Sequence, residues 1–462
     1  MRPVTLEEVR AATGARIVNC PSEDVVSGAA IDSREVRPGD LFFALRGRTD
    51  GALYARSAIE AGAAAVVADR PLESLPTLVV EDPLAALQSL ARWSLSDLKN
   101  EAPAIVGITG TVGKTTTKDA LAAILRNSGS RTFATAGNFN NEIGLPLTVL
   151  AAGPRTEHLV LEMGATHAGD ITQLCSIARP SVGILTAISP VHLDSFGSLE
   201  ALAEAKGELA TCLLENGTLV APSGVPAAAV ASERSLARRI SFAADEGISG
   251  GVDLSASGVS ETTEGLRFTV EYEGRSAEVL APVFGTHLIQ PLLAAIGGGL
   301  ALGLSLEECA AGAARIKRTG LRGELFSLRG DITVYDDSYN ASPAAMSAVL
   351  KYGAGQAAQQ ERRFVAILGG MFELGSSTRA YHQEIGDVAA TSGVDLLVCV
   401  GEEARWYAET FPGESVAYPD AETAAEELPG LLKPNDYVVV KGSRGIGLDR
   451  VTLTLKESLP LV

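Results

Sequence analysis

The sequence has few basic residues for its length. Its 462 residues include 38 Lys and Arg against 56 Asp and Glu, which gives a formal net charge of −18. Nucleic acids and anionic membranes bind proteins through a basic face. The composition therefore argues against either of them as the main partner, and any anionic ligand must be held by a local group of basic side chains.

Cysteine and long apolar runs are also scarce. The chain has five cysteines and no Cys-x-x-Cys pair, which favours free buried thiols in a reducing cytosol over disulfides or a zinc site. No stretch reaches about 18 uninterrupted apolar residues, so membrane insertion is not expected. The opening segment, Met1-Arg-Pro-Val-Thr-Leu-Glu-Glu8, is acidic where a signal peptide needs an apolar core. We therefore expect a cytoplasmic protein.

What is present is the length and the patterning of three α/β domains. We expect a small mixed α/β domain over residues 1–102, a central domain over 103–317 and a Rossmann-like α/β domain over 318–462. Between Ala104 and Ala221, apolar strands alternate with amphipathic helices, which predicts a doubly wound parallel sheet. Shorter segments of alternating polarity between Arg239 and Ala281 predict added antiparallel strands.

One glycine-rich stretch predicts a phosphate-binding loop. In Val106-Gly-Ile-Thr-Gly-Thr-Val-Gly-Lys-Thr-Thr-Thr-Lys118, an apolar strand ends and a helix begins. Lys114 and the helix N-terminus supply positive potential for a polyphosphate, and Thr115 offers a hydroxyl to Mg²⁺. The strict P-loop pattern is not met, because Ile108 occupies the place of its first glycine. A strand-to-helix turn without a ligand is the alternative interpretation.

Three further polar residues stand out by position. Glu162 and His192 follow predicted strands, at the edge where a parallel sheet binds ligands. Glu162 can reach Mg²⁺ from there, or it is a solvated carboxylate at a strand end; a lone loop histidine such as His192 is more often structural. Lys206 lies on a predicted helix between Glu204 and Glu208, and this spacing indicates an exposed lysine with acidic neighbours.

The boundary before the third domain carries a basic cluster of Arg315, Lys317, Arg318 and Arg322. An arginine there can donate charge-assisted hydrogen bonds to a phosphate, and a solvated hinge is the alternative. The run Asp336-Asp-Ser-Tyr-Asn-Ala-Ser-Pro343 follows a predicted strand and combines two carboxylates with an amide. It suits a ribose or a substrate amine, or it is an ordinary helix cap.

Together these residues resemble the Mur ligase family, ATP-dependent amide-forming enzymes of peptidoglycan synthesis, over essentially the whole chain. The resemblance rests on seven motifs: Gly107-Ile-Thr-Gly-Thr-Val-Gly-Lys-Thr-Thr-Thr-Lys118, Gly137-Asn-Phe-Asn-Asn-Glu-Ile-Gly-Leu-Pro146, Glu162-Met-Gly-Ala165, His192-Leu-Asp-Ser-Phe-Gly197, Ala205-Lys-Gly-Glu208, Asp336-Asp-Ser-Tyr-Asn340 and Lys441-Gly-Ser-Arg444.

The N-terminal segment refines the resemblance. Asp32-Ser-Arg34 and Pro38-Gly-Asp-Leu-Phe-Phe-Ala-Leu-Arg-Gly47 are similar to the part of the family that holds the uridine nucleotide of the substrate. The resemblance thus implies substrate contacts from Ser33, Arg34 and Arg46. This segment favours the MurF or MurE branches, and the Asp-Asp-Ser-Tyr-Asn-Ala motif favours the MurF branch.

The resemblance implies a specific reaction. A carboxylate of a UDP-N-acetylmuramoyl tripeptide attacks the γ-phosphate of ATP to give an acyl phosphate, which the amine of D-alanyl-D-alanine then displaces. It also implies Mg²⁺ held by Thr115, Glu162, His192 and a carbamylated Lys206. The resemblance implies four catalytic residues: Glu162, His192 and Lys206 from this set, together with Lys114.

The remaining implied roles divide between the nucleotide and the substrates. Asn140, Asn141 and Lys441 would contact the substrates, and closure of the third domain would exclude water from the acyl phosphate. ATP would be held by a set of residues from two domains: Gly110, Thr111, Gly113, Lys114, Thr115, Thr116, His287, Arg322, Asp337 and Asn340.

The sequence departs from the family at several positions. Ala187 stands where an asparagine is usual, and Pro291 replaces an asparagine of the His-Asn-x-x-Asn motif that begins at His287. Gly370 stands where an aspartate is expected. Further departures, at Leu288, Ser342 and Ala52, put adenine and acceptor contacts in doubt more than they affect the reaction type.

Two other functions remain open at this stage. One is a related amide ligase acting on folylpolyglutamate or another muramoyl peptide, against which the uridine-like Asp32-Ser-Arg34 segment speaks. The other is a degenerate, nucleotide-binding regulator, suggested by Ala187, Pro291 and Gly370. We expect a monomer, and the sequence does not distinguish diaminopimelate from lysine as the third residue of the peptide.

Overall fold

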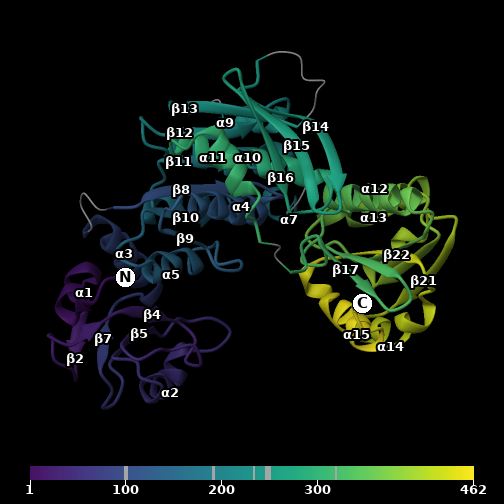
Figure 1. The fold of residues 1–462 in the computed structure, drawn as a ribbon. Helices are drawn as coiled ribbons and strands as arrows, with labels where there is room; N and C mark the ends of the chain where they lie inside the picture. The colour runs from purple at the N-terminus through teal and green to yellow at the C-terminus, as the bar shows by residue number, and fades with distance from the viewer. Residues whose placement is uncertain (98–101, 190–192, 233–234, 245–250, 318–319, 462) are drawn as a thin grey trace.

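Three large sheets, one each in the N-terminal, central and C-terminal parts of the chain, organise the described residues, and β1 and β3 form a further two-stranded sheet (Figure 1). The central part lies above the other two in this view, with the N-terminal part and the yellow C-terminal part on opposite sides below it. The computed structural model describes residues 1–97, 102–189, 193–232, 235–244, 251–317 and 320–461.

The N-terminal part contains a five-stranded mixed sheet with the order β2-β7-β6-β5-β4, in which only the β2–β7 pair is antiparallel. Its first helix begins at Leu6, because the Thr5 side chain and Glu8 form a reciprocal capping box. The elements are β1 (Val4–Thr5), α1 (Leu6–Thr13), β2 (Arg16–Val18), β3 (Val25–Val26), β4 (Gly28–Ala30), β5 (Asp40–Phe43), η1 (Gly51–Tyr54), α2 (Ala55–Glu60), β6 (Ala65–Ala68), β7 (Thr77–Val79) and α3 (Pro83–Asp97).

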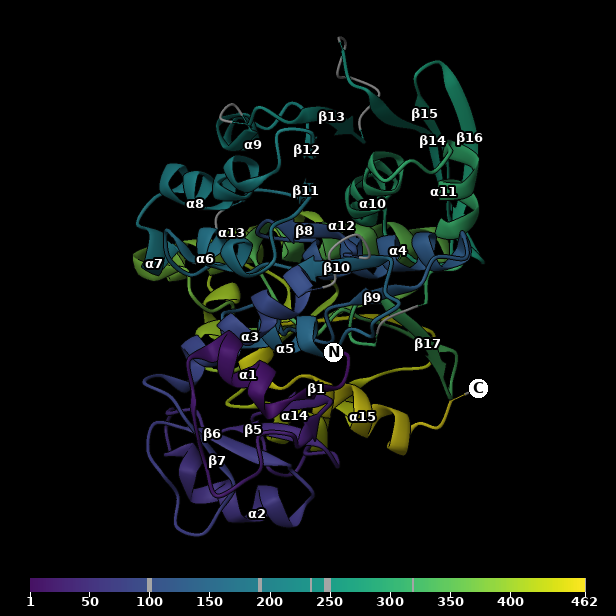
Figure 2. The ribbon, with the colours of Figure 1, turned by 90° about the vertical axis from the view of Figure 1, so that its left-hand side faces the viewer.

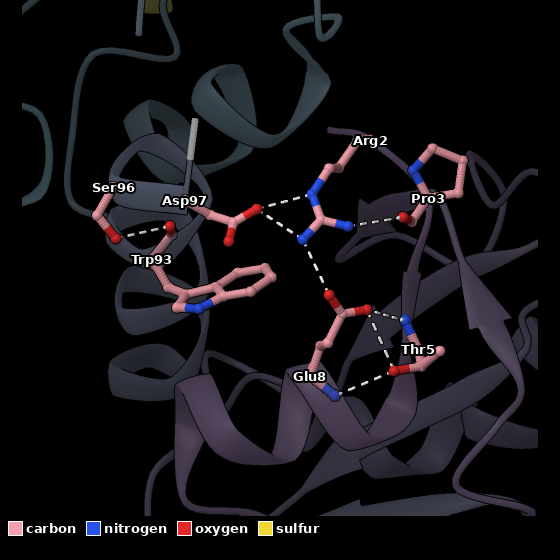
Figure 3. A network of polar contacts seen from close by, with 7 residues as sticks. All are labelled: Arg2, Pro3, Thr5, Glu8, Trp93, Ser96 and Asp97. Atoms are coloured by element: carbon pink, nitrogen blue, oxygen red, sulfur yellow. Dashed lines mark hydrogen bonds and ion pairs between the residues drawn. The ribbon is translucent and has the colours of Figure 1, made fainter. Parts of the chain in front are cut away.

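A polar network fastens the start of the chain to α1 and α3 (Figure 3). The Arg2 guanidinium donates through Nε to Asp97 Oδ2 at 2.8 Å and through Nη2 to Glu8 Oε1 at 2.9 Å, and it lies 5.6 Å from the centre of the Trp93 ring. Glu8 also accepts from the Thr5 backbone amide at 2.8 Å. One arginine thus links the capped end of α1 to the last turn of α3.

The central part is a nine-stranded sheet with the order β16-β15-β14-β13-β12-β11-β8-β10-β9. Every pair from β9 to β14 is parallel, and β15 and β16 continue the same sheet in antiparallel pairing. The prediction of antiparallel strands between Arg239 and Ala281 is confirmed for the β14–β15 and β15–β16 pairs and is wrong for β13, which pairs in parallel with β12 and β14. Its strands are β8 (Ala104–Thr109), β9 (Thr132–Ala134), β10 (His158–Glu162), β11 (Val182–Leu185), β12 (Thr218–Pro222), β13 (Arg238–Ala243), β14 (Leu254–Thr262), β15 (Gly265–Tyr272) and β16 (Arg275–Ala281).

Helices cover both faces of this sheet, as its continuously apolar strands require. On one face, α4, α10 and α11 share an apolar core with β8, β11 and β14–β16. On the other face, α5, α6 and α8 share a core that continues into the N-terminal sheet and α3, which lies beside α5 (Figure 2). The helices are α4 (Lys114–Asn127), α5 (Gly144–Ala151), α6 (Asp170–Ile177), α7 (Leu193–Phe196), α8 (Leu199–Cys212), α9 (Pro226–Ser232), η3 (Thr286–Leu288), α10 (Ile289–Ala301) and α11 (Leu306–Ala313).

The C-terminal part has a six-stranded sheet with the order β17-β18-β22-β19-β20-β21, parallel except for the β17–β18 pair. Two apolar clusters fill its two faces. The elements are β17 (Glu324–Leu328), β18 (Ile332–Asp336), α12 (Pro343–Gln359), β19 (Arg363–Gly369), η4 (Gly375–Ser377), α13 (Thr378–Thr391), β20 (Leu396–Val400), η5 (Glu403–Tyr407), β21 (Glu414–Tyr418), α14 (Ala421–Leu431), β22 (Asp436–Lys441), η6 (Arg444–Ile446) and α15 (Asp449–Ser458).

Specific bonds join the central and C-terminal parts. The buried Tyr335 hydroxyl donates to the Phe284 carbonyl at 3.0 Å. Glu261, at the end of β14, accepts from the Gly285 amide at 2.9 Å and from Gln356 Nε2 of α12 at 2.6 Å. These contacts hold the start of the C-terminal sheet against the segment that follows β16.

Candidate active site

The predicted phosphate loop has the backbone that its glycines permit. It joins β8 to α4, with Gly110 at φ +143° and Gly113 at φ +86°. A Cβ on Gly110 would lie 2.2 Å from Thr186 Oγ1, so a larger residue would need the loop to move. The Thr111 amide and hydroxyl are both bonded to the Ala187 carbonyl, at 2.8 and 3.1 Å.

Lys114 arches back over this loop. Its Nζ donates to the Gly110 carbonyl at 2.9 Å and to the Thr111 carbonyl at 3.3 Å. Burial lowers the pKa of this ammonium below its ordinary value, the Glu162 carboxylate opposes that shift, and Arg322 adds to it. The cation therefore stands at the N-terminus of α4 with no carboxylate within bonding distance among the described residues, which suits a phosphate.

Glu162 and Thr115 bring two side-chain oxygens together beside the phosphate loop. Thr115 Oγ1 donates to Glu162 Oε2 at 2.8 Å, and Asn140 Nδ2 donates to Glu162 Oε1 at 2.8 Å. The carboxylate is only 3% exposed at the end of β10. Mg²⁺ binds to proteins through one or two carboxylates together with substrate phosphates and water. This donor set beside a phosphate loop fits that ion.

The third predicted metal ligand, His192, lies outside the described residues, and its role stays a prediction. Within the described part of the chain, no group of three His, Cys, Asp or Glu side chains is placed to hold a metal by itself. The fit to Mg²⁺ thus rests on Thr115 and Glu162 and on the phosphates that the loop would bring.

The hydroxyl of Thr115 gives a direct prediction. Thr115→Val keeps the shape of the side chain and removes one oxygen, and we expect a rate about ten- to a hundredfold lower together with a higher Mg²⁺ requirement. Thr117→Val is the matched control, since that hydroxyl donates to the Pro291 carbonyl inside the domain. Titration of activity with Mg²⁺ measures both variants, and a parent-like Mg²⁺ curve for Thr115→Val contradicts the assignment.

Lys206 is buried, so the prediction of an exposed lysine from its spacing was wrong. Only 2% of it is exposed, and its Nζ donates to the Ala165 carbonyl at 3.0 Å. Glu208 does not pair with it, because that carboxylate accepts from the Gly169 and Thr172 amides at the start of α6. Desolvation, with a smaller contribution from Lys114, lowers the pKa of Lys206 to about 7.

A cavity of about 420 Å³ separates the loop from the C-terminal part. Its central wall is the loop from Thr111 to Thr115 with Asn140 and Glu162. Its opposite wall combines predicted and unpredicted residues from the segments before β17 and after β18 and β22: Arg322, Asp337, Tyr339, Asn340, Ser443 and Arg444. The structure thus brings together four of the predicted cofactor residues from the central domain, Thr111, Gly113, Lys114 and Thr115, and three from the C-terminal domain, with Gly110 and Thr116 directly beside the cavity in the chain.

Aromatic and ionic contacts hold that opposite wall. The centre of the Tyr339 ring lies 3.7 Å from the Arg322 guanidinium and 5.7 Å from that of Arg444, so both arginines lie within cation–π distance of one phenol. Lys441 is 3% exposed and is ion-paired with Asp337, and it donates to the Asn340 carbonyl at 2.9 Å. Lys441 therefore supports the loop that carries these residues and lines none of the cavities described here.

A second cavity, of about 210 Å³, contains Lys206, Asn141, Thr166 and Asp170. It shares Lys114 and Asn140 with the first cavity. The part of the first cavity beside the phosphate loop therefore adjoins the cavity lined by Lys206. Asn141 also caps α5, since its Oδ1 accepts from the Gly144 amide at 2.9 Å.

A third cavity, of about 110 Å³, lies on the far side of the loop and is lined by Thr116, His287, Pro291, Arg322 and Asp337. His287 Nδ1 is buried and has no hydrogen-bond partner among the described residues. Desolvation lowers the pKa of His287 to about 4, so the imidazole is neutral near pH 7 and can accept a proton or donate one to a base edge.

The predicted N-terminal substrate residues lie apart from these cavities. Ser33 and Arg34 follow β4, and Arg34 is ion-paired with Asp32 at an exposed site. Arg46 follows β5 and is ion-paired with Asp69. None of the three lines a cavity described above. Their uridine contacts remain a prediction.

The three departures from the family occupy different surroundings. Ala187 acts through its backbone, since its carbonyl accepts from Thr111. Pro291 forms an apolar wall of the His287 cavity, 3.0 Å from where a Cβ on Gly113 would lie. Gly370 lies beside Glu403, and it lines none of the three cavities. The retained loop therefore keeps its partners despite all three changes.

Comparisons with known proteins agree with this geometry. Three family models match successive parts of the chain: "Mur ligase family, catalytic domain" over residues 12–92, "Mur ligase middle domain" over 108–299 and "Mur ligase, glutamate ligase domain" over 321–444. The UDP-N-acetylmuramoyl-tripeptide–D-alanyl-D-alanine ligase of Bacillus subtilis is 34% identical over 447 residues, with 94% of each chain covered. The chain belongs to the Mur ligase family.

A further relative and two solved structures are similar to this Mur ligase over nearly the whole chain. The enzyme of the same name from Escherichia coli is 34% identical, over 92% of this chain and 93% of that protein. A crystal structure of MurF from Acinetobacter baumannii superposes with a TM-score of 0.89, at 28% identity and with 99% of each chain covered. MurF from Thermotoga maritima, solved in complex with ADP, gives a TM-score of 0.81 at 28% identity, over 94% of this chain and 98% of that one.

Proposed function

We propose that this Mur ligase joins D-alanyl-D-alanine to a UDP-N-acetylmuramoyl tripeptide at the expense of ATP, in peptidoglycan synthesis. The observation that carries the proposal is the meeting of two cavities at Lys114 and Asn140, one reaching the arginines of the C-terminal part and the other ending at Lys206. The names of the full-length relatives support the substrates.

The first step is the transfer of a phosphoryl group to a carboxylate. A carboxylate oxygen of the tripeptide attacks the γ-phosphorus, the bond to the β-phosphate oxygen breaks, and ADP leaves. Both reactants are anions, so alignment and charge neutralisation provide most of the catalysis. Lys114 and Arg322 line the first cavity as the cations for the phosphates, and Arg444 lies beside Arg322 on the Tyr339 ring.

The second step forms the amide. The amine of D-alanyl-D-alanine attacks the carbonyl carbon of the acyl phosphate, phosphate leaves, and the amine loses a proton. The acyl phosphate would be lost to water in an open site. The cavity between the central loop and the residues of the C-terminal part gives the geometry by which closure excludes water.

Mg²⁺ is the cofactor that this site would hold, through Thr115 and Glu162 and, by the family resemblance, through His192 and Lys206. When bound, it neutralises charge on the transferring phosphate. We propose that Lys206 is carbamylated, since an amine with a pKa of about 7 is substantially neutral under physiological conditions and so able to add CO₂.

The carbamate predicts a pH dependence. The pKa of Lys206 in the fold is about 7 instead of its ordinary 10.5, so raising the pH through about 7 deprotonates the amine and lowering it restores an ammonium that cannot react. We expect the carbamate signal of carbon-labelled bicarbonate in NMR at about pH 8 and its loss by about pH 6. Lys206→Met removes the assigned signal; the same signal in that variant contradicts the assignment.

The substrate proposal has its own test. Phosphate release is measured with ATP, the UDP-muramoyl tripeptide and D-alanyl-D-alanine, and then with each component omitted or replaced. We expect release only with all three, with either lysine or diaminopimelate as the third residue preferred. Release with a folate or another muramoyl peptide in place of the tripeptide favours a different ligase; tight ATP binding without release favours a nucleotide-binding regulator.

Location and oligomeric state stay predictions. All five cysteines are free, as expected in the reducing cytoplasm, and no described helix has the length and apolar character needed to span a membrane. We propose a cytoplasmic monomer.

A further inference from the structure

A fourth cavity, of about 890 Å³, adjoins the catalytic one, with which it shares Thr115, Arg322 and Tyr339, and most of its lining has no role in the reaction proposed above. One wall is the face of α4 from Thr115 to Arg126. A second wall is the segment after β9, from Ala134 to Gly137, and the third is formed by Arg315, Lys317 and Arg322 before the C-terminal sheet. Its volume is about twice that of the first cavity, which measures about 420 Å³.

The charge of this cavity is opposite to that of the protein. Five cations line it and only one carboxylate, Asp119, although the chain carries a net charge of −18. Asp119 Oδ1 lies 3.0 Å from Lys118 Nζ. The other four cations are Arg126, Arg315, Lys317 and Arg322. Cations gathered in a concave surface raise the local concentration of anions.

Four of the five cations have no carboxylate partner among the described residues. Within the described residues, Arg126, Arg315, Lys317 and Arg322 form no ion pair with a carboxylate; Arg126 makes only long bonds, of 3.3 and 3.4 Å, to the Thr132 carbonyl. Elsewhere in the chain, exposed arginines such as Arg131 are paired with glutamates. The guanidinium groups of the cavity are therefore available to an external anion.

We propose that this cavity is a second binding site, for a phosphate chain. Guanidinium groups bind phosphate oxygens in a bidentate manner, and several of them around one space match a polyanion better than a single carboxylate. The volume admits a nucleotide or inorganic polyphosphate. Because Arg322 and Tyr339 line both this cavity and the catalytic one, an anion bound here competes with the catalytic site for Arg322.

The test measures binding alone and is independent of the ligase reaction. The full chain carrying Lys114→Ala, which weakens the catalytic loop, is titrated calorimetrically with inorganic tripolyphosphate. We expect one bound equivalent. Adding Arg126→Gln, Arg315→Gln and Lys317→Gln, three exposed positions, lowers the affinity at least tenfold, since each removes a charged donor. Circular dichroism confirms that the variant is folded.

A charge-matched control separates the site from the net charge. Arg131→Gln, Arg239→Gln and Arg275→Gln remove three exposed cations that do not line the cavity, and we expect the affinity of the Lys114→Ala chain to be unchanged. No binding to the Lys114→Ala chain, or equal loss in both triple variants, overturns the proposal. ATP and UDP serve as further arms: tighter binding than tripolyphosphate identifies a nucleotide as the source of the phosphate chain, and equal or weaker binding identifies an inorganic polyphosphate.

Discussion

Lys114→Ala is expected to lower the rate of ATP-dependent phosphate release at least about a thousandfold, which corresponds to about 4 kcal/mol of transition-state stabilisation. The reason is the position of this cation, at the N-terminus of α4 over the phosphate loop and on the wall shared by the two catalytic cavities. Charge on the transferring phosphate is neutralised mainly by such groups.

The loss has to be separated from unfolding. Lys114 donates only to two loop carbonyls, Gly110 and Thr111, so its removal leaves the apolar core around α4 intact and thermal unfolding is expected to stay close to that of the parent. Lys351→Ala, at an exposed position of α12, is the control and keeps full activity. A Lys114→Ala protein within tenfold of the parent rate would remove this lysine from the mechanism.

Lys206→Ala is the second large effect, with an expected loss of at least about a hundredfold in rate. The side chain is buried beside Ala165 and lines the cavity that meets the phosphate end. If the lysine acts as a carbamate, the variant lacks an anion at that place. A small carboxylate such as acetate can enter the space left by the side chain, and we expect it to restore part of the rate to Lys206→Ala.

The rescue distinguishes an anionic role from packing. Acetate is expected to leave the parent and the Lys114→Ala variant unchanged, because neither has a vacated anion site. Activity of Lys206→Ala equal to the parent contradicts any catalytic role for this lysine. A loss that no carboxylate restores, accompanied by lower thermal stability, assigns Lys206 to packing between α8 and the Ala165 loop.

Local patterns predicted most of the elements around the site. The alternation of apolar strands and amphipathic helices predicted between Ala104 and Ala221 is present as β8, α4, β10, α6, β11, α8 and β12. Elements with little periodicity were missed. β9 is a three-residue strand at the sheet edge, and α5 is apolar on nearly all sides because it lies between the N-terminal part and the central sheet. Its burial is decided by that packing.

Site residues were predictable where a side chain suited to Mg²⁺ also stood at a strand end or after a glycine turn. Glu162 follows an apolar strand and Thr115 follows a glycine turn, and the structure places them 2.8 Å apart. Lys206 was misread from the charges beside it. Its burial follows instead from the helical stripe it shares with Leu202 and Leu209, both fully buried, which the sequence spacing of four and three residues contains.

Contacts between distant segments could not be read from the sequence. Arg444 and Tyr339 lie 105 positions apart, and the guanidinium lies within cation–π distance of the phenol. Two signals were available for Arg444: it follows the apolar strand β22 directly, and it closes the Lys441-Gly-Ser-Arg444 motif. The substrate contact expected of Lys441 stays a prediction; in the structure its Nζ donates to the Asp337 and Asn340 carbonyls, because two neighbouring strands of the parallel sheet end together.

The central claim is that the tripeptide carboxylate becomes an acyl phosphate before the amide forms. The most direct measurement uses a UDP-muramoyl tripeptide whose terminal carboxylate is labelled with heavy oxygen, with ATP and D-alanyl-D-alanine, and analyses the released phosphate by mass spectrometry. The account predicts one labelled oxygen in each phosphate, matched by one molecule of amide product. Unlabelled phosphate, released while the peptide keeps both labelled oxygens, would contradict it.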